Sequence, residues 1–201
     1  ESLQFLGVQR PTFLRQNYVH ILPYAILHRD ADLIRHTYAA GDNDGSLGGL
    51  LINHNSDILA EVFTREHDSK LKDTLKFYRA LVQGDNDTQV TIPKLITLCV
   101  APLLVRMIVR LCKSESHDAI LTALQRVHQF GHPDQRRQST KQDVIIFLKQ
   151  HMLGIISELN DMLHDMHEKK TIKQKLEVIS SYEALIRLAG STMAVYSPQV
   201  W

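Results

Sequence analysis

The sequence predicts an all-α protein, built of antiparallel helix pairs that stack one on the next. Three observations lead to this fold class. Apolar side chains recur at intervals of three and four residues, the period of an amphipathic helix. Glycine, proline and short polar stretches divide the chain into about eight or nine such segments. No stretch alternates as a strand does, and residues 90–93 are too short and too close to a proline to form one.

The first 40 residues are expected to form two helices. A first helix can begin at Thr12 and run toward His28. Pro23 lies within this helix and should bend or break it, because proline supplies no backbone N–H group. Asp30 is a suitable N-cap for the second helix, which ends before Gly41.

The following segment is expected to hold two or three helices. Ser46 caps a short helix, and Ser56 can cap the one that follows it. One continuous helix over residues 46–65 is the alternative. A further helix covers residues 69–83 and is stopped by Gly84.

Residues 92–113 are apolar on most faces of a helix and are expected to be deeply buried. Pro93 and Pro102 interrupt this segment, which predicts one bent helix or two short ones. Ser116 then caps a helix that runs through Phe130.

The last third of the chain predicts two long helices. Thr140, with Asp143 three residues later, resembles a capping box at the start of the first helix. Thr171 opens the second helix, which ends at Gly190. The first helix carries an apolar stripe at spacings of three and four: Ile145, Leu148, Met152, Ile155, Leu159, Met162 and Met166. Further apolar residues widen this face: Ile146, Phe147, Leu153, Ile156 and Leu163.

This apolar stripe has two interpretations. A strict repeat of three and four can be a coiled-coil seam that pairs with another chain. A wider face is instead what a helix needs when it packs between its own partner and the next helix pair. The flanking apolar residues favour the second interpretation.

The predicted helices group into pairs of similar length, near residues 12–40, 46–83, 92–130 and 140–190. Short loops make sequential helices antiparallel neighbours. A repeat of about 35–45 residues is typical of HEAT-like helical repeats. We therefore predict a HEAT-like α-solenoid, with a compact helical bundle as the alternative.

Composition narrows the class of protein. Apolar residues are 44% of the 201 residues, so a folded chain is expected. The net charge of +1 is too small to indicate a protein that binds nucleic acid or a membrane surface. The longest uncharged apolar stretch, residues 95–105, has about half the length that crosses a bilayer.

The two cysteines and the two ends of the chain give further expectations. Cys99 and Cys112 lie in an apolar segment and are expected to be free, buried thiols, as in an intracellular protein. The chain begins at Glu1 without an initiator methionine or signal peptide, and it ends at Trp201 without a polar tail. We expect it to be a fragment of a longer polypeptide.

Eleven histidines raise the question of a metal site. The densest group contains Asp161, His164, Asp165 and His167, of which the first three can share one helix face. A zinc site needs three or four ligands at one point. Because this group lies at a helix end beside other charged residues, we interpret it as a solvated turn and predict no metal ligand.

The chain carries no sequence motif of an enzyme. A nucleophile elbow, a Walker A loop, a dinucleotide-binding glycine motif, an HExxH pair and a kinase catalytic set are all missing from the sequence. Gly45, Gly48 and Gly49 are interpreted as turn and helix-start residues. We therefore expect no catalytic and no cofactor-binding residue in this segment.

Two short basic stretches were weighed as sites. Residues 136–139 (RRQS) resemble a basophilic phosphorylation site, and a phosphate on Ser139 would meet the backbone donors of a helix N-terminus. A solvated loop is the simpler interpretation. The lysines at 169, 170, 173 and 175 are diluted by glutamates and lack interleaved aromatic residues, so no direct nucleic-acid binding is expected.

Several motifs occur in an order that points to one family. Residues 18–27 (YVHILPYAIL) form a proline-containing apolar segment, and LIN follows at 51–53. LGII stands at 153–156, a lysine-leucine step at 175–176, LIRLAG at 185–190 and PQV at 198–200. This ordered set resembles the UME domain, with the helices before it, of the ATR-type checkpoint kinases.

The resemblance implies a noncatalytic scaffold. Residues 1–94 would be HEAT-like helical repeats and residues 95–201 the UME domain. The whole protein would be a phosphatidylinositol-3-kinase-related serine/threonine protein kinase in the nucleus, active in the DNA-damage and replication checkpoint and in DNA repair. Its catalytic domain, which uses ATP and Mg, would lie far beyond this segment. Expected partners are an ATRIP-type subunit, other regions of the same kinase and a second protomer, with no membrane.

Two other functions remain open. The apolar excess and Met152, Met162 and Met166 are compatible with a freestanding helical adaptor that binds peptide or protein partners. The histidine count motivates the other hypothesis, a helical enzyme with a histidine-bound metal.

Overall fold

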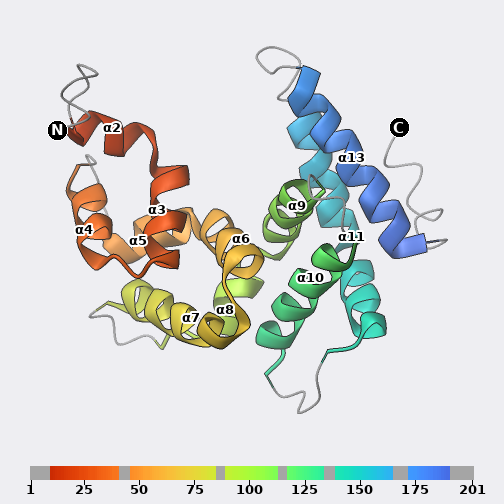
Figure 1. Ribbon diagram of the computed structural model, residues 1–201, viewed down its shortest axis with the longest axis horizontal. Coiled ribbons are helices and arrows are strands. Elements are labelled where there is room, and N and C mark those ends of the chain that lie inside the picture. Colours follow the sequence, from red (N-terminus) through yellow and green to blue (C-terminus); the bar gives the residue numbers. More distant parts are fainter. Residues whose placement is uncertain are drawn as a thin grey trace. The chain divides into compact units, whose positions relative to one another are not determined.

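The computed structural model describes residues 10–40, 46–84, 89–112, 117–133, 139–164 and 172–190. All regular structure in these ranges is helical, which confirms the predicted all-α class (Figure 1). The chain divides into two compact units, Glu1–Leu95 and Ile96–Trp201, and each has a buried apolar core.

Helix α3 is central to the packing of the first unit. It contacts α2, α4, α6 and α7, while α5 and α6 also pack against α7. Leu22 and Ile26 of α3 are fully buried by these contacts. The helices of this unit are α2 (Arg10–Gln16), α3 (Tyr18–Leu27), α4 (Ala31–Ala39), α5 (Leu47–Asn53), α6 (Asn55–Arg65) and α7 (Asp68–Gln83), and the unit boundary falls within α8 (Ile92–Thr97).

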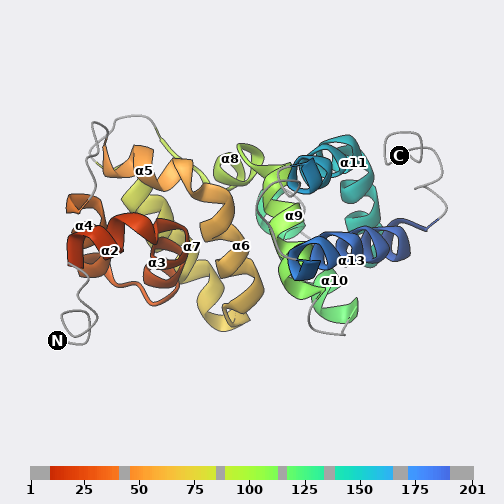
Figure 2. The same cartoon turned by 90° about the horizontal axis from the view of Figure 1, so that it is seen from above.

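The second unit is built around two helices that contact nearly all the others. Its helices are α9 (Val100–Leu111), α10 (His117–Gly131), α11 (Lys141–His164) and α13 (Ile172–Ala189). Both α9 and α11 contact α10 and α13, and they also contact each other (Figure 2). The stacking of helices within each unit agrees with the predicted solenoid-like fold.

Three of the predicted helix caps are confirmed. Oδ1 of Asp30 accepts the backbone N–H three residues on at 2.9 Å, and Oγ of Ser46 does the same at 3.1 Å. Thr140 and Asp143 form the reciprocal capping box: Thr140 Oγ1 accepts the Asp143 N–H at 3.2 Å, and Asp143 Oδ2 accepts the Thr140 N–H at 2.9 Å. These side chains satisfy backbone donors that a helix start leaves free.

The break in the first predicted helix lies at Asn17 and not at Pro23. Pro23 is a buried residue inside α3. Asn17 instead has a non-helical backbone, with φ −120° and ψ 22°, and its Nδ2 donates to the Phe13 carbonyl at 2.8 Å. A short polar side chain can compete with the backbone for such a carbonyl, which explains why the helix ends there.

The second break falls at His54, between α5 and α6. Ser56 is buried within α6 and is not its N-cap, so that prediction is wrong, and so is the alternative of one continuous helix. The backbone of His54 departs from helical values, with φ −104° and ψ 14°. Asn55, which follows it, is drawn into a buried hydrogen bond with the Leu95 carbonyl at 2.7 Å.

The apolar segment after residue 91 forms two helices, which confirms two short helices over one bent helix. The break between them lies at residues 98–99, and both prolines stand near helix starts. Pro93 is the second residue of α8, and Pro102 is the third residue of α9. At these positions the missing N–H costs no intrahelical hydrogen bond, so neither proline bends a helix.

The ends of the long helices agree in part with the predictions. Gly84 and Gly190 adopt φ values of 49° and 59° after α7 and α13, the left-handed conformation that glycine tolerates. α7 begins at Asp68, one residue before the predicted start. The predicted caps Ser116 and Thr171 lie outside the described residues.

The apolar face of α11 is narrower than predicted. Leu148, Met152, Ile155 and Leu159 are buried, whereas the outer members Ile145 and Met162 are half-buried and Met166 lies outside the described residues. Of the flanking residues, Phe147 and Ile156 are buried and Leu163 is half-buried. Ile146 and Leu153 are 45% and 59% exposed, so those two do not widen the buried face.

Candidate functional site

A close contact between α9 and α11 uses the glycine of the LGII motif. A Cβ atom on Gly154 would lie 3.0 Å from the Cβ of Ala101 on α9. Two small residues thus let the helix axes approach, while Ile155 and Ile156 are buried beside them. Leu153, the first residue of the motif, is exposed. The motif therefore combines packing residues with one surface residue.

A tyrosine joins α13 to α11. The Tyr182 hydroxyl donates to Oδ1 of Asn160 at 2.6 Å and lies 3.5 Å from the Ile156 carbonyl, one turn before that asparagine. Burial raises the pKa of the Tyr182 hydroxyl above its ordinary value. The hydroxyl therefore remains a neutral donor and holds the two helices in register.

The first unit contains the same arrangement. The Tyr78 hydroxyl of α7 donates to Oδ1 of Asn55 at 2.8 Å and lies 3.2 Å from the Leu51 carbonyl, four residues before that asparagine. Tyr78 is fully buried. A tyrosine–asparagine clasp is thus present in each unit. Helical repeats often keep such a feature while the neighbouring residues differ.

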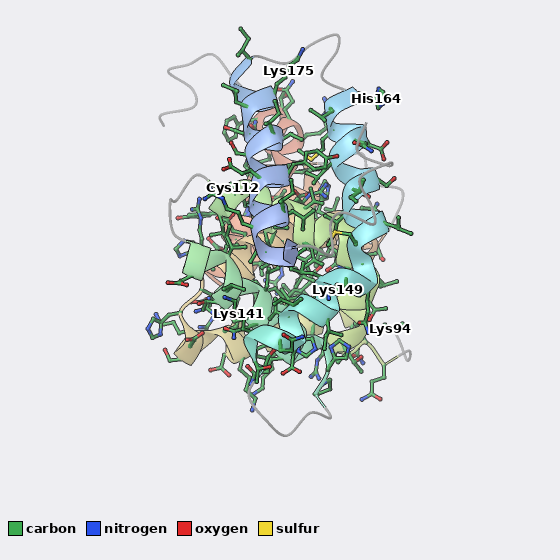
Figure 3. The ribbon with its side chains drawn as sticks, turned by 90° about the vertical axis from the view of Figure 1, so that its right-hand side faces the viewer. Lys94, Cys112, Lys141, Lys149, His164 and Lys175 are labelled. Carbon is green, nitrogen blue, oxygen red and sulfur yellow. The ribbon has the colours of Figure 1, made fainter. Side chains whose placement is uncertain are left out.

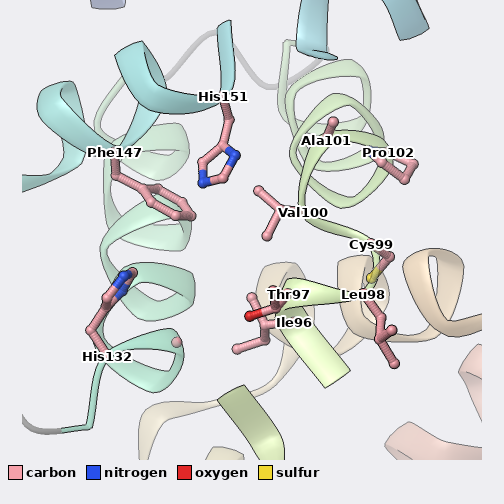
Figure 4. Close-up of a pocket in the computed structure, with 11 residues that line it drawn as sticks. Ile96, Thr97, Leu98, Cys99, Val100, Ala101, Pro102, His132, Phe147 and His151 are labelled. Atoms are coloured by element: carbon pink, nitrogen blue, oxygen red, sulfur yellow. The ribbon is translucent and has the colours of Figure 1, made fainter. Parts of the chain in front are cut away.

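A hollow of about 480 Å³ lies among α9, α10, α11 and the end of α8 (Figure 4). Phe147 and His151 of α11 face Val100 across it, and His132 lies at its edge. The ring centroids of Phe147 and His151 are 4.9 Å apart, and those of Phe147 and His132 are 5.9 Å apart. Its lining combines apolar groups with two imidazoles that can exchange hydrogen bonds with a ligand.

This histidine group was not predicted from the sequence, where only the group near His164 was considered as a site. His128 of α10 and His132, the first residue after that helix, stand four residues apart, and their rings stack with centroids 4.7 Å apart. Phe147 and His151 have the same spacing on α11. The spacing of four was the available signal. The convergence of the two pairs could not be read from it, because it depends on how α10 packs against α11.

Burial sets the protonation state of His128 and His151. It lowers the pKa of His128 below its ordinary value, and the nearby His132 adds to the effect, while Asp143 opposes it. Burial likewise lowers the pKa of His151. These two imidazoles are therefore neutral at pH 7 and act as hydrogen-bonding groups.

His128 also connects this group to Ser139, which lies two residues before the start of α11. Its Nδ1 lies 2.9 Å from Oγ of Ser139, and the Ser139 carbonyl accepts from Nε2 of Gln125 at 3.2 Å. Two side chains of α10 thereby hold the start of α11. The interpretation of residues 136–139 as a solvated loop stays a prediction, and the arginines at 136 and 137 lie outside the described residues.

The acidic and histidine residues at 161–167 form no metal site among the residues that the structure describes. Asp161 and His164 lie at the end of α11, while Asp165 and His167 lie outside the described residues (Figure 3). No group of three or more histidine, cysteine or acidic side chains in the described part of the chain could hold a metal ion.

The two cysteines differ in their surroundings. Cys99 is buried, as predicted, whereas Cys112 is half-buried, and both are free thiols. Cys112 lies between α9 and α13, with its Sγ 3.7 Å from the Ser180 carbonyl. Burial raises the pKa of the Cys112 thiol, so the thiol is neutral and unreactive at pH 7.

The outer face of α13 carries four exposed aliphatic side chains together with the exposed ion pair of Glu183 and Arg187. Its other face packs on α9 and α11 and buries Val178, Leu185 and Leu188. On the outer face, side chains at spacings of four, three and seven are half or more exposed: Ile172 (79%), Leu176 (56%), Ile179 (56%) and Ile186 (50%). We call these four residues the α13 stripe. Their spacing is that of a helix face that another helix can cover.

Comparison with known proteins places the second unit in a family context. The model of the UME (NUC010) domain matches residues 147–201, which include most of α11, all of α13 and the α13 stripe. The prediction that the domain begins at residue 95 stays a prediction. No helix in the described ranges is long and apolar enough to cross a membrane.

One curated relative matches nearly the whole chain. Protein kinase rad3 of Schizosaccharomyces pombe is 23% identical over 199 residues, which are 98% of this chain and 8% of that protein. The chain thus spans a small part of that relative's length. No solved structure matches it. The family match and this relative confirm the resemblance predicted from the motifs: the chain is similar to a UME-domain segment of an ATR-type protein kinase.

Proposed function

We propose that the chain is a noncatalytic α-solenoid scaffold segment of an ATR-like serine/threonine kinase of the DNA-damage and replication checkpoint. Its role is to position an ATRIP-type partner subunit and the kinase domain. In this proposal the complete protein is nuclear, and its ATP- and Mg-dependent catalytic domain lies outside the 201 residues. The match to the UME domain and the similarity to protein kinase rad3 support the proposal.

The α13 stripe is the observation that carries this proposal. A helix that only closes a core has one apolar face, whereas α13 also carries four exposed aliphatic side chains on its outer face, beside the Glu183–Arg187 ion pair. Covering four large aliphatic side chains would remove enough apolar surface to favour association. The stripe therefore suits a helix from the partner subunit or from another region of the same kinase.

Placing a negative charge in the α13 stripe tests this function in the full-length kinase complex. Leu176→Glu and Ile179→Glu should leave the fold intact, because both side chains are more than half exposed. We expect less partner subunit to co-purify and substrate phosphorylation to fall by about tenfold, since each buried charge opposes docking. Ser180→Glu, an exposed change on the same helix outside the stripe, is the matched control.

The outcomes of this experiment separate the alternatives. Unchanged co-purification and activity in both stripe variants would contradict the scaffold role of α13. An equal loss in Ser180→Glu would show that any added charge on this helix is harmful, and the stripe would then have no special part.

A freestanding helical adaptor is the second candidate function, and the hollow beside Phe147 and His151 favours it. The hollow has the size of a site for a small ligand or a few side chains of a peptide. Titration of the chain with amphipathic helical peptides, monitored by amide chemical shifts, tests this function. Saturable shifts around the hollow would support the adaptor, and their absence at millimolar peptide would exclude it.

A further inference from the structure

A small basic hollow lies in the first unit, where the end of α3 meets the loop between α6 and α7. Its volume is about 500 Å³. It is lined by Leu27, His28, Arg29, Arg65, Glu66 and Lys70. Four of these six side chains are basic types, and they come from three separate parts of the chain. None of the four basic residues belongs to the motifs that support the UME resemblance.

Arg29 occupies a backbone position that normally calls for glycine. It has φ 54°, the only positive φ of a non-glycine residue in the described part of the chain. The Arg29 N–H bonds to the Ile26 carbonyl at 3.1 Å, and the Asp30 N–H bonds to the Ala25 carbonyl at 2.8 Å. These two bonds form a Schellman motif, in which the left-handed residue is usually glycine. A side chain kept at such a position at a cost in stability indicates a use for it.

Arg29 and Lys70 supply two of the charges at the hollow. Neither side chain forms an ion pair or a hydrogen bond with another residue in the described ranges. Both residues are exposed. Arg65 is partly neutralised, because its Nε lies 2.9 Å from Oε1 of Glu61. Two cations therefore remain available at the hollow.

The acidic residue in the hollow, Glu66, forms no ion pair with Arg29 or Lys70 in the described ranges. Glu66 is 9% exposed, and both of its carboxylate oxygens accept hydrogen bonds from within the fold. Oε2 accepts from Oγ1 of Thr74 at 2.7 Å, and Oε1 accepts from the His67 N–H at 3.0 Å. The buried carboxylate thus fixes the loop between α6 and α7 through two hydrogen bonds, while Arg29 and Lys70 are exposed.

We propose that this hollow binds a phosphate monoester carried by a phosphorylated serine or threonine of a protein partner. The planar guanidinium of Arg29 can bind two phosphate oxygens, and Lys70 adds a compact positive charge. Recognition of phosphorylated segments by a few converging basic side chains is a recurrent mode of peptide binding. This proposal concerns the first unit and does not depend on the scaffold role of the α13 stripe.

The shape and charge of the hollow favour a peptide over a nucleic acid. A nucleic acid requires a track of cations along its backbone, or aromatic platforms for its bases. Here the basic side chains converge on one point, and the whole chain has a net charge of only +1. One dianionic group matches this arrangement better than a polyanion does.

A short phosphopeptide tests the proposal with the 201-residue chain. The probe is acetyl-Ala-phosphoserine-Ala-amide, titrated while the amide resonances are followed by NMR. We expect saturable shifts at residues 28–30 and 66–70, and none with the unphosphorylated peptide. Lys70→Gln should weaken binding by about tenfold, because one charged hydrogen-bonding group is lost. Lys72→Gln, an exposed change on α7 outside the hollow, should bind as the unchanged protein does.

Arg29→Gly separates binding from folding. Glycine relieves the positive φ, so this variant should be more stable than the original chain while it loses the guanidinium. Higher stability with binding weakened about tenfold or more is the expected combination. Unchanged phosphopeptide binding in Arg29→Gly and Lys70→Gln would overturn the proposal. Equal affinity for inorganic phosphate or tighter binding of a single-stranded DNA oligonucleotide would also overturn it, because the site would then not be specific for a phosphopeptide.

Discussion

Two adjacent glycines in α5 show how packing gives different roles to identical residues. A Cβ atom on Gly48 would lie 2.5 Å from the backbone oxygen of Val82 on α7. On Gly49 it would meet only Oγ of Ser46, at 3.5 Å, an ordinary contact. The sequence treats both residues as helix-start glycines. Nothing in their spacing reveals that α7 approaches one of them, so this part of the fold could not be predicted from local pattern.

The two glycines should respond in opposite directions to alanine. Gly48→Ala should lower the free energy of unfolding by about 1–3 kcal/mol, because the added methyl group must push the α7 backbone away. Gly49→Ala should raise it by about 0.5–1 kcal/mol, because alanine favours the helix and has room. Denaturant unfolding of both variants measures these changes. Equal effects would show that helix propensity, and not the contact with Val82, decides both.

The buried imidazole of His128 predicts a dependence of stability on pH. Burial lowers its pKa below the ordinary value of 6.5 in the folded protein. As the pH falls below 6.5, the unfolded chain takes up the proton first, so the free energy of unfolding decreases. The contribution is complete above about pH 6.5 and is lost toward the folded-state pKa.

Unfolding measured between pH 7.5 and pH 5.5 checks this prediction. His128→Gln should reduce the loss of stability across that range, because glutamine does not titrate and can still bond to Ser139. His20→Gln, a change at an exposed histidine, is the control. An unchanged pH dependence in His128→Gln would assign the effect to other groups.

At the scale of helices, the predictions succeeded where the signal is local. The caps at Asp30, Ser46 and Thr140 depend on residues within three positions, and the structure confirms them. Breaks that depend on an individual side chain or on tertiary contacts were predicted at the wrong residues: the sequence predicted Pro23 and a cap at Ser56, and the structure has Asn17 and His54. The histidine hollow was missed for a similar reason, since it requires α10 and α11 to meet.

The tyrosine–asparagine clasps predict how firmly each helix pair is held. Tyr78→Phe should cost about 1–3 kcal/mol, because Asn55 loses a hydrogen-bond donor deep in the core. Tyr182→Phe should cost less, about 0.5–1.5 kcal/mol, because Tyr182 is 9% exposed and water can replace part of the bond. Thermal or denaturant unfolding measures both, and Tyr24→Phe, at a tyrosine 54% exposed, is the control. A cost for Tyr182→Phe equal to that for Tyr24→Phe would show that the second clasp adds nothing.

At the scale of the whole chain, the structure and the comparisons cover different parts. The family match is confined to residues 147–201, and the compact unit that contains it begins at Ile96. The order of motifs let the similarity to the UME domain be predicted from sequence, and LGII and LIRLAG both hold buried residues. The α13 stripe was not predicted from the sequence. Its residues obey the same period as buried ones, and only the packing on α9 and α11 decides which face remains open.

Because each unit has its own buried core, a packing defect in one should loosen that unit alone. Gly48→Ala tests the first unit, and Gly154→Ala tests the second, where the new Cβ would lie 3.0 Å from that of Ala101. Hydrogen exchange followed by mass spectrometry should show faster exchange in α5 and α7 for the first variant. It should show faster exchange in α9 and α11 for the second. The change in opening free energy should be about 1–3 kcal/mol in the altered unit and near zero in the other. Faster exchange throughout the chain in either variant would mean that the two cores open together, as one cooperative body.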